Sequence, residues 1–217
     1  MMKLSCLTDS EIWLSFKKGE EWAVSYIYKE YSPKLYQYGV KFTVNVPLVE
    51  DTIQDLFTEL IKNHKTIGET NNILFYLLKS FRRKLFRKME SEKKYSNGTE
   101  PEEYQFEVVW SIEHDLIIEE EANQKKTSLL KALDKLTPRQ KEVIYLRFTK
   151  ELDYCSIAEI MNISIESCRN LISKAIFNIK KGKREKIKFA INIFYLSPNG
   201  RNISEVVFDA ILLSVIM

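Results

Sequence analysis

The sequence predicts an all-α protein made of two small helical domains joined by an acidic linker. Glycine and proline, which mark turns, number only 6 and 5 in 217 residues, and this scarcity favours long helices over a many-stranded sheet. Apolar residues recur at intervals of three and four, the period of a helix that buries one face. Hydrophobic residues make up 45% of the chain, which is enough to build packed cores.

Charge is distributed unevenly along the chain, and the net charge of +3 hides this pattern. Residues 76–94 carry eight Lys and Arg against two acids, and residues 169–188 carry eight against one. Between them, residues 100–121 carry nine acids and no Lys or Arg. Two separate cationic segments on one chain indicate a protein that grips a polyanion at two places.

No catalytic constellation is evident in the sequence. The three cysteines are far apart and lack metal-ligand spacing, which favours a reduced, cytoplasmic setting. His64 and His114 are isolated, and we find no nucleophile–base pair, metal cluster or phosphate-binding glycine loop. We therefore predict a non-enzyme without cofactor or metal. We expect no secretory signal and no membrane insertion, because no apolar run is long enough for either.

The first predicted helix begins at a capping box. Thr8 and Glu11 have the spacing at which the two side chains cap each other's backbone N–H groups. The helix should run to about Lys18, because Gly19 can end it. This local pattern gives both ends of the helix without any knowledge of its neighbours.

A second helix is predicted over about 21–31. Ser32-Pro33 then indicates either the start of a third helix or a kink in the second, because serine caps helices and proline suits their first turn. The apolar residues of this part recur at helical period and are expected to face the core. They are Trp22, Tyr26, Ile27, Leu35 and Tyr38.

The next helix is predicted over 47–63, with Pro47 at its start. Its apolar positions are spaced by three and four: Val49, Ile53, Leu56, Phe57, Leu60 and Ile61. The opposite face is polar and acidic: Glu50, Asp51, Gln54, Asp55, Thr58 and Glu59. Such a face is either simply solvated or docks a partner through its acids, and periodicity leaves both open.

A polar loop at 63–71 leads into a basic helix at 72–90. The expected buried face of this helix is Leu74, Leu77, Leu78, Phe81 and Leu85, and the expected cationic face is Lys79, Arg82, Arg83, Lys84, Arg87 and Lys88. Aromatic residues lie among them: Phe75, Tyr76 and Phe86. Cations neutralise phosphates and rings stack on unpaired bases, so this helix suits nucleic acid. A basic face that only solubilises the helix is the alternative.

The second half of the chain opens with a polar, acidic connection and a short helix expected at 115–133. Its acids either form a solvated linker or cover a basic face until a partner arrives. Thr137 and Pro138 then start a helix over 138–149. Helices at 154–161 and 165–181 follow, separated by a short turn and with Ser164 as the cap of the last. This is helix-turn-helix geometry.

The last helix of this motif would place its first turns in a major groove, where arginine pairs with guanine and asparagine with adenine. Its exposed polar residues are Glu166, Ser167, Arg169, Asn170, Ser173 and Lys174. Its inward positions are Ile165, Cys168, Leu171, Ile172, Ala175 and Ile179. Cys168 is then a small core residue, not a reactive thiol.

Over about 8–185 the chain resembles bacterial RNA polymerase sigma factors of the extracytoplasmic-function group, within the sigma-70 superfamily. Residues 51–57, DTIQDLF, resemble the D-x-x-Q-[DE]-x-F segment of region two, and residues 133–143 resemble the L-x-x-L-T-P-R-Q-[KR]-x-V opening of region four. The turn entry at 152–155 lacks the glycine or small residues often found near it in the family. The resemblance implies a region-two helical bundle over 8–92, a flexible acidic linker over 93–126, a region-four helix-turn-helix over 127–185 and a tail of unknown role over 186–217.

The same resemblance implies roles for particular residues. Core polymerase would be held, through the clamp of its largest subunit, by Asp51, Gln54, Asp55 and Phe57. The minus-ten element would be melted and read by His64, Lys65, Asn71, Tyr76, Lys79, Arg82, Arg83 and Arg87, with the loop at 64–71 taking a flipped base. The minus-thirty-five element would be read by Ser164, Glu166, Ser167, Arg169, Asn170, Ser173 and Lys174. Promoter DNA is thus an expected partner both as duplex and as melted strand.

Two other functions remain open at this point. The chain could be a stand-alone helix-turn-helix regulator whose first half senses or dimerises, or an interaction protein whose acidic stretch and apolar tail capture a basic partner. Association with core polymerase separates the sigma factor from the first alternative. An anti-sigma protein is a further partner that the resemblance allows.

Overall fold

The computed structural model describes residues 7–95, 105–107 and 133–181, and these are all helix, turn or loop, with no strand. They belong to two compact units, Met1–Gln105 and Phe106–Met217. The first holds α1 (Asp9–Lys17), α2 (Glu21–Gly39), α3 (Val46–Lys62) and α4 (Ile73–Tyr95). The second holds α6 (Pro138–Ile144), the π-helical turn η2 (Tyr145–Thr149), α7 (Tyr154–Met161) and α8 (Ile165–Lys181). The predicted all-α fold is confirmed.

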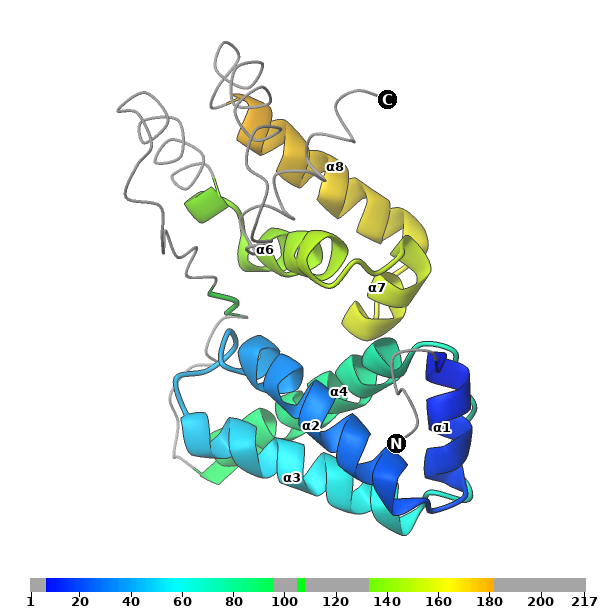
Figure 1. Cartoon of the computed structure of the whole chain (residues 1–217). Coiled ribbons are helices and arrows are strands. Elements are labelled where there is room, and N and C mark those ends of the chain that lie inside the picture. Colours follow the sequence, from blue (N-terminus) through cyan, green and yellow to red (C-terminus); the bar gives the residue numbers. More distant parts are fainter. Residues whose placement is uncertain (1–6, 96–104, 108–132, 182–217) are drawn as a thin grey trace, which may run out of the picture. The chain divides into compact units, whose positions relative to one another are not determined.

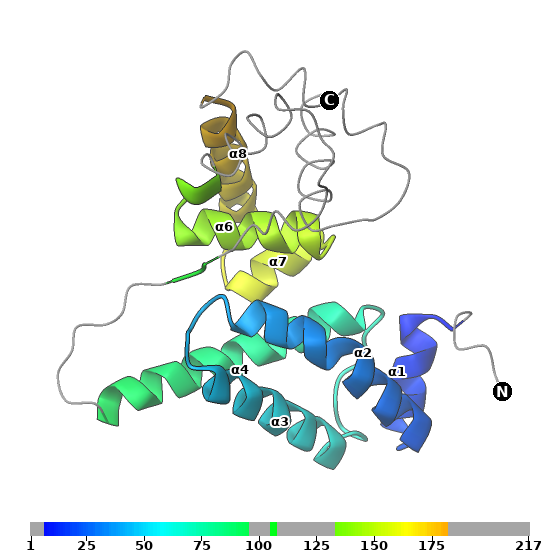
Figure 2. The same cartoon turned by 60° about the vertical axis from the view of Figure 1, so that its left-hand side comes forward.

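The first unit is a bundle in which α2, α3 and α4 pack on one another. Helix α1 packs against α2 and α4, at the end of the bundle where α3 stops and α4 begins (Figures 1 and 2). Gly39, at the end of α2, lets side chains of α3 and α4 pack directly against the backbone of α2. A Cβ atom there would lie 2.6 Å from Val49 Cγ1 on α3 and 2.8 Å from Phe81 Cζ on α4, so any side chain would force these helices apart.

Helix α2 is continuous through Pro33, so the alternative that a third helix starts at that proline is wrong. The apolar face of the bundle is buried as predicted at most positions. Two expected core residues are exceptions: Trp22 and Ile61 are exposed. Trp22 lies in the first turn of α2, where its Nε1–H donates to the Glu20 carboxylate at 2.5 Å instead of packing in the core.

In the second unit, α8 packs on both α6 and α7. Helix α6 begins at a capping box between Thr137 and Gln140, which confirms the predicted cap. The predicted helix over 138–149 changes character at Tyr145. Its last turn is π-helical, with Lys150 N donating to the Tyr145 carbonyl, five residues back, at 3.2 Å.

A piece of the acidic connection belongs to this second unit. Phe106 is 0% exposed and meets the Tyr145 ring edge-on, with 5.7 Å between ring centroids. Its neighbour Glu107 pairs with Lys141 of α6 at 3.8 Å. Helix α4 continues to Tyr95, past its predicted end at 90. The short helix expected at 115–133 lies almost entirely outside the described residues, as does the tail.

Candidate nucleic-acid interface

The helix-turn-helix is fixed by three polar groups at its turns. Asp153 caps α7 by accepting from Ser156 N at 2.6 Å, and this backbone hydrogen bond is the main reason that the pKa of Asp153 is lowered. Asn162 ends α7 in the left-handed conformation, with φ 53°. Ser164 then accepts from Ser167 N at 3.1 Å and so caps α8. The two helices are thereby separated by a three-residue turn, as this motif requires.

Helix α8 separates its two faces clearly. Cys168, Ile172 and Ala175 are buried, and burial raises the pKa of the Cys168 thiol to about 11, which makes it unreactive at neutral pH. Ile165, predicted to face inward, is exposed because it is the first residue of the helix. The residues predicted to read duplex DNA are all exposed: Ser164, Glu166, Ser167, Arg169, Asn170, Ser173 and Lys174.

The ring of Tyr154, at the start of α7, lies close to the guanidinium groups of two arginines, Arg147 and Arg169. The Arg147 guanidinium carbon lies 4.9 Å from the centroid of the Tyr154 ring, and that of Arg169 lies 5.8 Å from it. Arg147 also donates through Nη1 to the Leu152 carbonyl at 2.8 Å. Sequence reasoning selected Arg169 but missed Tyr154 and Arg147, because the contacts cross between elements.

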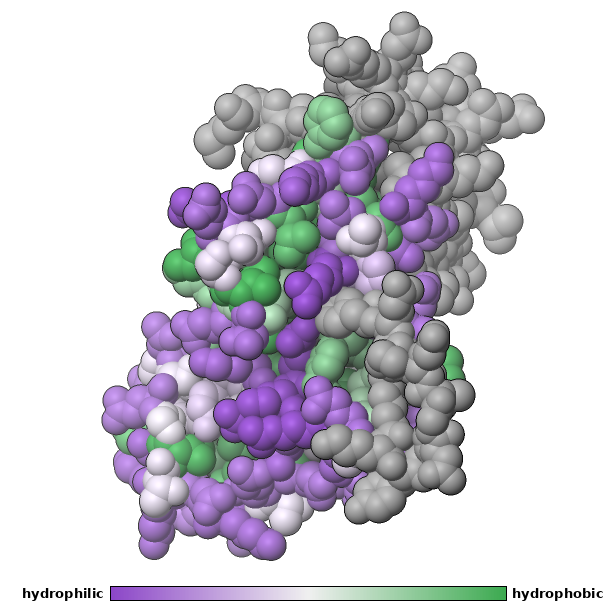
Figure 3. Space-filling view, turned by 180° about the vertical axis from the view of Figure 1, so that it is seen from behind, coloured by the Kyte–Doolittle hydropathy of each residue, from purple (hydrophilic) through white to green (hydrophobic). Residues whose placement is uncertain are grey.

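In the first unit, the cationic and aromatic residues of α4 form a stripe. Tyr76, Lys79, Arg83 and Arg87 are separated by three, four and four residues, which places them on one side of the helix. Lys79, Arg83 and Arg87 are exposed. Tyr76 is half-buried, and burial raises the pKa of its hydroxyl. The aspect of this unit seen in Figure 3 is mainly hydrophilic, with a compact group of the most hydrophilic side chains.

Two aromatic rings support the cations of α4. The Lys79 ammonium lies 5.7 Å from the centroid of the Phe75 ring, and the Arg82 guanidinium carbon lies 4.5 Å from that of Phe86. These contacts hold long, flexible side chains over apolar rings. Basic and aromatic side chains of α4 therefore contact one another in the folded unit.

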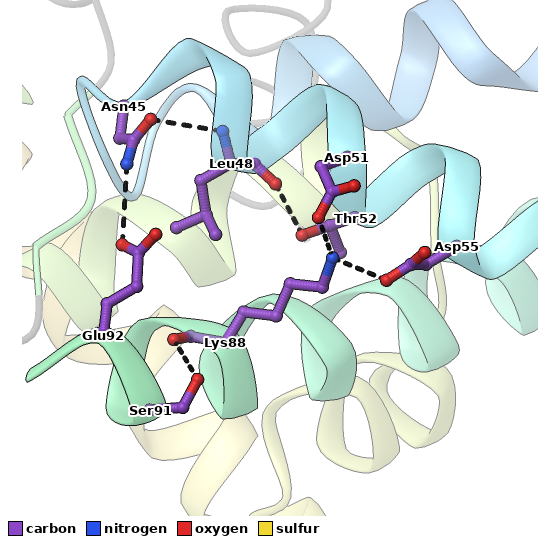
Figure 4. Close-up of polar contacts among 8 residues, drawn as sticks. All are labelled: Asn45, Leu48, Asp51, Thr52, Asp55, Lys88, Ser91 and Glu92. Atoms are coloured by element: carbon purple, nitrogen blue, oxygen red, sulfur yellow. Dashed lines mark hydrogen bonds and ion pairs between the residues drawn. The ribbon is translucent and has the colours of Figure 1, made fainter. Parts of the chain in front are cut away.

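Two further cations of α4, Lys84 and Lys88, pair with the acidic face of α3. The Lys88 ammonium lies between the carboxylates of Asp51 and Asp55, as Figure 4 shows, and it is 2.6 Å from Asp55 Oδ2. Lys84 pairs with Glu59 in the same way. The hydrogen bond from Lys88 is the main cause of the lowered pKa of Asp55. Part of the predicted cationic face thus pairs within the unit and is not presented to a ligand.

Of the four residues predicted to contact the polymerase, three are exposed and one is buried. Asp51, Gln54 and Asp55 are exposed on α3, on neighbouring turns. Phe57 is 3% exposed and packs edge-on against Tyr28 of α2, with 4.9 Å between ring centroids. Because its ring fills the core, Phe57 has no surface to offer a partner, and the prediction that it contacts the polymerase directly is corrected.

The loop between α3 and α4 presents some of its predicted residues and turns another inward. Lys65 and Asn71 are exposed. His64 is half-buried, and its Nδ1 lies 2.9 Å from the Lys17 carbonyl at the end of α1. Its ring therefore faces α1, whereas a DNA-contacting group was expected.

Within the ranges that the structure covers, no group of three or more His, Cys, Asp or Glu could hold a metal ion. None of the helices in those ranges is long and apolar enough to cross a membrane.

Comparison with known proteins agrees with this geometry. Residues 132–181 match the family described as sigma-70, region 4. The chain is similar to the sigma factor RpoE, which was solved in complex with the anti-sigma factor NepR from Bartonella quintana. The two sequences are 17% identical, the TM-score is 0.51, and the match covers 74% of this chain and 96% of the RpoE chain. The structure of CnrH with the cytosolic domain of CnrY gives 13% identity, a TM-score of 0.48, and coverage of 80% and 95%. Curated proteins gave no match.

The structure thus contains a helix-turn-helix unit and a separate four-helix unit. The region 4 match and the fold shared with RpoE confirm the resemblance to sigma factors that the sequence indicated. Residues 132–181 thus form a sigma-70 region 4 domain, and the chain shares its fold with the sigma factor RpoE.

Proposed function

We propose that this chain is a sigma factor of the extracytoplasmic-function group that serves transcription initiation, and that it reads a promoter with two surfaces, one on each unit. The start of α8 reads the minus-thirty-five element as duplex. The stripe on α4 and the loop at 64–71 hold the melted minus-ten element. The observation that carries this proposal is the exposure of all seven predicted residues at the start of α8, while Cys168 and Ile172 on the opposite face are buried. A helix with that division can enter a major groove without losing its core.

The domain limits that we propose follow the same division. Residues 8–92 form region two, residues 127–185 form region four, and 93–126 connect them. The basic residues of both regions would neutralise DNA phosphates, which makes binding strongly salt-dependent. The chain itself performs no catalysis in this scheme and needs no cofactor, and it acts in the cytoplasm with the polymerase.

Core RNA polymerase is the proposed partner of α3. Gln54 is exposed between Asp51 and Asp55, so an amide and two carboxylates are available on neighbouring turns. The pairing of both acids with Lys88 fixes their side chains before docking, which lowers the entropy lost on binding. Phe57 supports this face from the core. An anti-sigma protein is a further proposed partner, supported by the fold shared with RpoE, which was solved with NepR.

The test is transcription by bacterial core polymerase with the purified full chain on fragments of genomic DNA. We expect defined start sites that depend on the chain. Arg169→Ala should weaken use of the upstream element, and Asn178→Ala, exposed further along α8, should not. A base contact of this kind contributes about 1–3 kcal/mol of discrimination. Failure to initiate on any fragment would refute the proposal.

Polymerase capture is tested separately by affinity purification. Gln54→Ala should reduce recovery of core polymerase and leave the melting temperature unchanged, because the side chain is exposed. Gln37→Ala, at an exposed glutamine on α2, is the matched control. If the chain does not associate with polymerase but binds duplex operators tightly, it is a stand-alone regulator instead.

A further inference from the structure

We infer that helix α1 is a template that fixes the conformation of the loop between α3 and α4, and that Trp13 is the positioning residue at its centre. This inference rests on the proposed function of that loop as the reader of a minus-ten base. Three hydrogen bonds join the two segments. They link the loop at its start, its middle and its end to successive points along α1.

The three contacts run in a regular, antiparallel order. His64, at the start of the loop, lies 2.9 Å from the Lys17 carbonyl. In the middle, the Gly68 carbonyl accepts from Trp13 Nε1 at 2.8 Å. At the far end, Ile73 N, the first amide of α4, donates to a carboxylate oxygen of α1 at 2.8 Å. As the loop advances by four and five residues, its partners on α1 step back by four each.

That carboxylate belongs to Asp9, which therefore caps α4 from a different helix. Its other oxygen accepts from the Tyr31 hydroxyl of α2 at 3.3 Å. Burial, followed by the charge of Asp9, raises the pKa of Tyr31 well above its usual value, so this hydroxyl stays a donor. The N-terminus of α4 is thus anchored to both α1 and α2 through one side chain.

Trp13 connects the loop to the aromatic end of the α4 stripe. Its side chain is buried, and its ring stacks on Phe16 with 5.3 Å between centroids. The ring also lies 4.8 Å from that of Tyr76, a residue proposed to contact the melted strand. One side chain therefore sets both the loop backbone at Gly68 and the ring of Tyr76. A shift of the indole would move both parts of the proposed base site together.

His64 closes the other end of the template. Gly19, just after α1, has φ +81°, and a Cβ atom there would lie 3.1 Å from His64 Cε1. The glycine thus leaves room for the imidazole to reach the Lys17 carbonyl. Gly68, by contrast, has open space around its Cβ position, so only its backbone carbonyl is used.

The consequence for function is preorganisation. A loop that takes up a flipped base must hold its backbone groups in place before the base arrives, since ordering them on binding would cost affinity. The hydrogen bonds from helix α1 hold the loop backbone in one conformation before the base binds. We therefore expect Trp13 to affect the choice of a minus-ten base without touching DNA, and to leave reading of the minus-thirty-five element unchanged.

The first experiment measures the template itself and does not depend on DNA. Trp13→Phe keeps an aromatic ring and removes the donor to Gly68. In the full chain, trypsin cleavage after the exposed Lys65 should become about fivefold faster relative to cleavage after Lys29 in α2, the change expected for loss of one hydrogen bond. Trp22→Phe, which removes an indole N–H that donates only to Glu20, should leave this ratio unchanged. An unchanged ratio in Trp13→Phe overturns the inference.

The second experiment measures the effect on promoter choice. Holoenzyme assembled with each variant transcribes a DNA library randomised over both promoter elements, and the transcripts are sequenced. The wild type should select bases in both elements, and Trp13→Phe should lose selection at a minus-ten position only. If Trp13→Phe keeps full selection, the inference is overturned. If the wild type itself selects no minus-ten base, the proposed function of the loop fails, whatever the proteolysis shows.

Folding of the variants is checked by thermal melting. Should Trp13→Phe fail to fold, His64→Phe carries the same two experiments, because its half-buried ring can still lie against Gly19 while losing the bond to Lys17. The expected results are the same: faster cleavage after Lys65 and loss of minus-ten selection alone. Unchanged cleavage in that variant would equally overturn the inference.

Discussion

Replacing Phe106 with alanine should destabilise the second unit, although this residue lies in the acidic connection and far from the helices of that unit in sequence. Its side chain is 0% exposed and packs against Tyr145. Burial of a phenylalanine side chain stabilises by about 1.5–3 kcal/mol. The segment can leave its site when the ring is lost, so the cost is limited to the free energy of docking. We expect a loss of ~2 kcal/mol.

The assay is hydrogen–deuterium exchange of the full chain, resolved by peptide. A loss of ~2 kcal/mol corresponds to exchange about 30-fold faster in amides that open only with the whole unit. Peptides from α6 and α8 should show this acceleration, and those from α3 and α4 should not. Phe177→Ala, at a phenylalanine that is 62% exposed on α8, is the matched control. An effect of Phe106→Ala no larger than that of the control would refute the reasoning.

Three further predictions concern stability. Glu151→Gly should stabilise the second unit by about 1 kcal/mol in denaturant unfolding, because Glu151 has φ 56° and glycine adopts that conformation without strain. Asp153→Ala should cost about 1 kcal/mol at neutral pH through loss of the cap on Ser156. Because the folded-state pKa of Asp153 is lowered, its contribution is present above the ordinary value and lost below it, so wild type and variant should converge as the pH falls below about 3.9. Lys88→Met should cost up to about 1 kcal/mol in the first unit, less at high salt, whereas Lys29→Met should cost nothing measurable.

Local signals account for the elements that sequence reasoning predicted well. The capping boxes at Thr8 and Thr137 and the serine cap at Ser164 set helix starts that the structure confirms within a residue. Each works through groups three residues apart, so the surrounding fold has little influence on it. The amphipathic period of α8 likewise gave its buried face, because that period is a property of the segment alone. Just before the turn entry, Glu151 adopts a left-handed backbone conformation, with φ 56°.

The tertiary structure decided everything that depends on which segments meet. The sequence by itself determined two all-helical units, a helix-turn-helix and the charge of each surface. It could not tell that Lys88 would turn to the acids of α3, that Phe57 would be buried against α2, or that the minus-ten loop would lie along α1. Those contacts join residues tens of positions apart, and their free energy arises only once the packing of the bundle has brought the partners together.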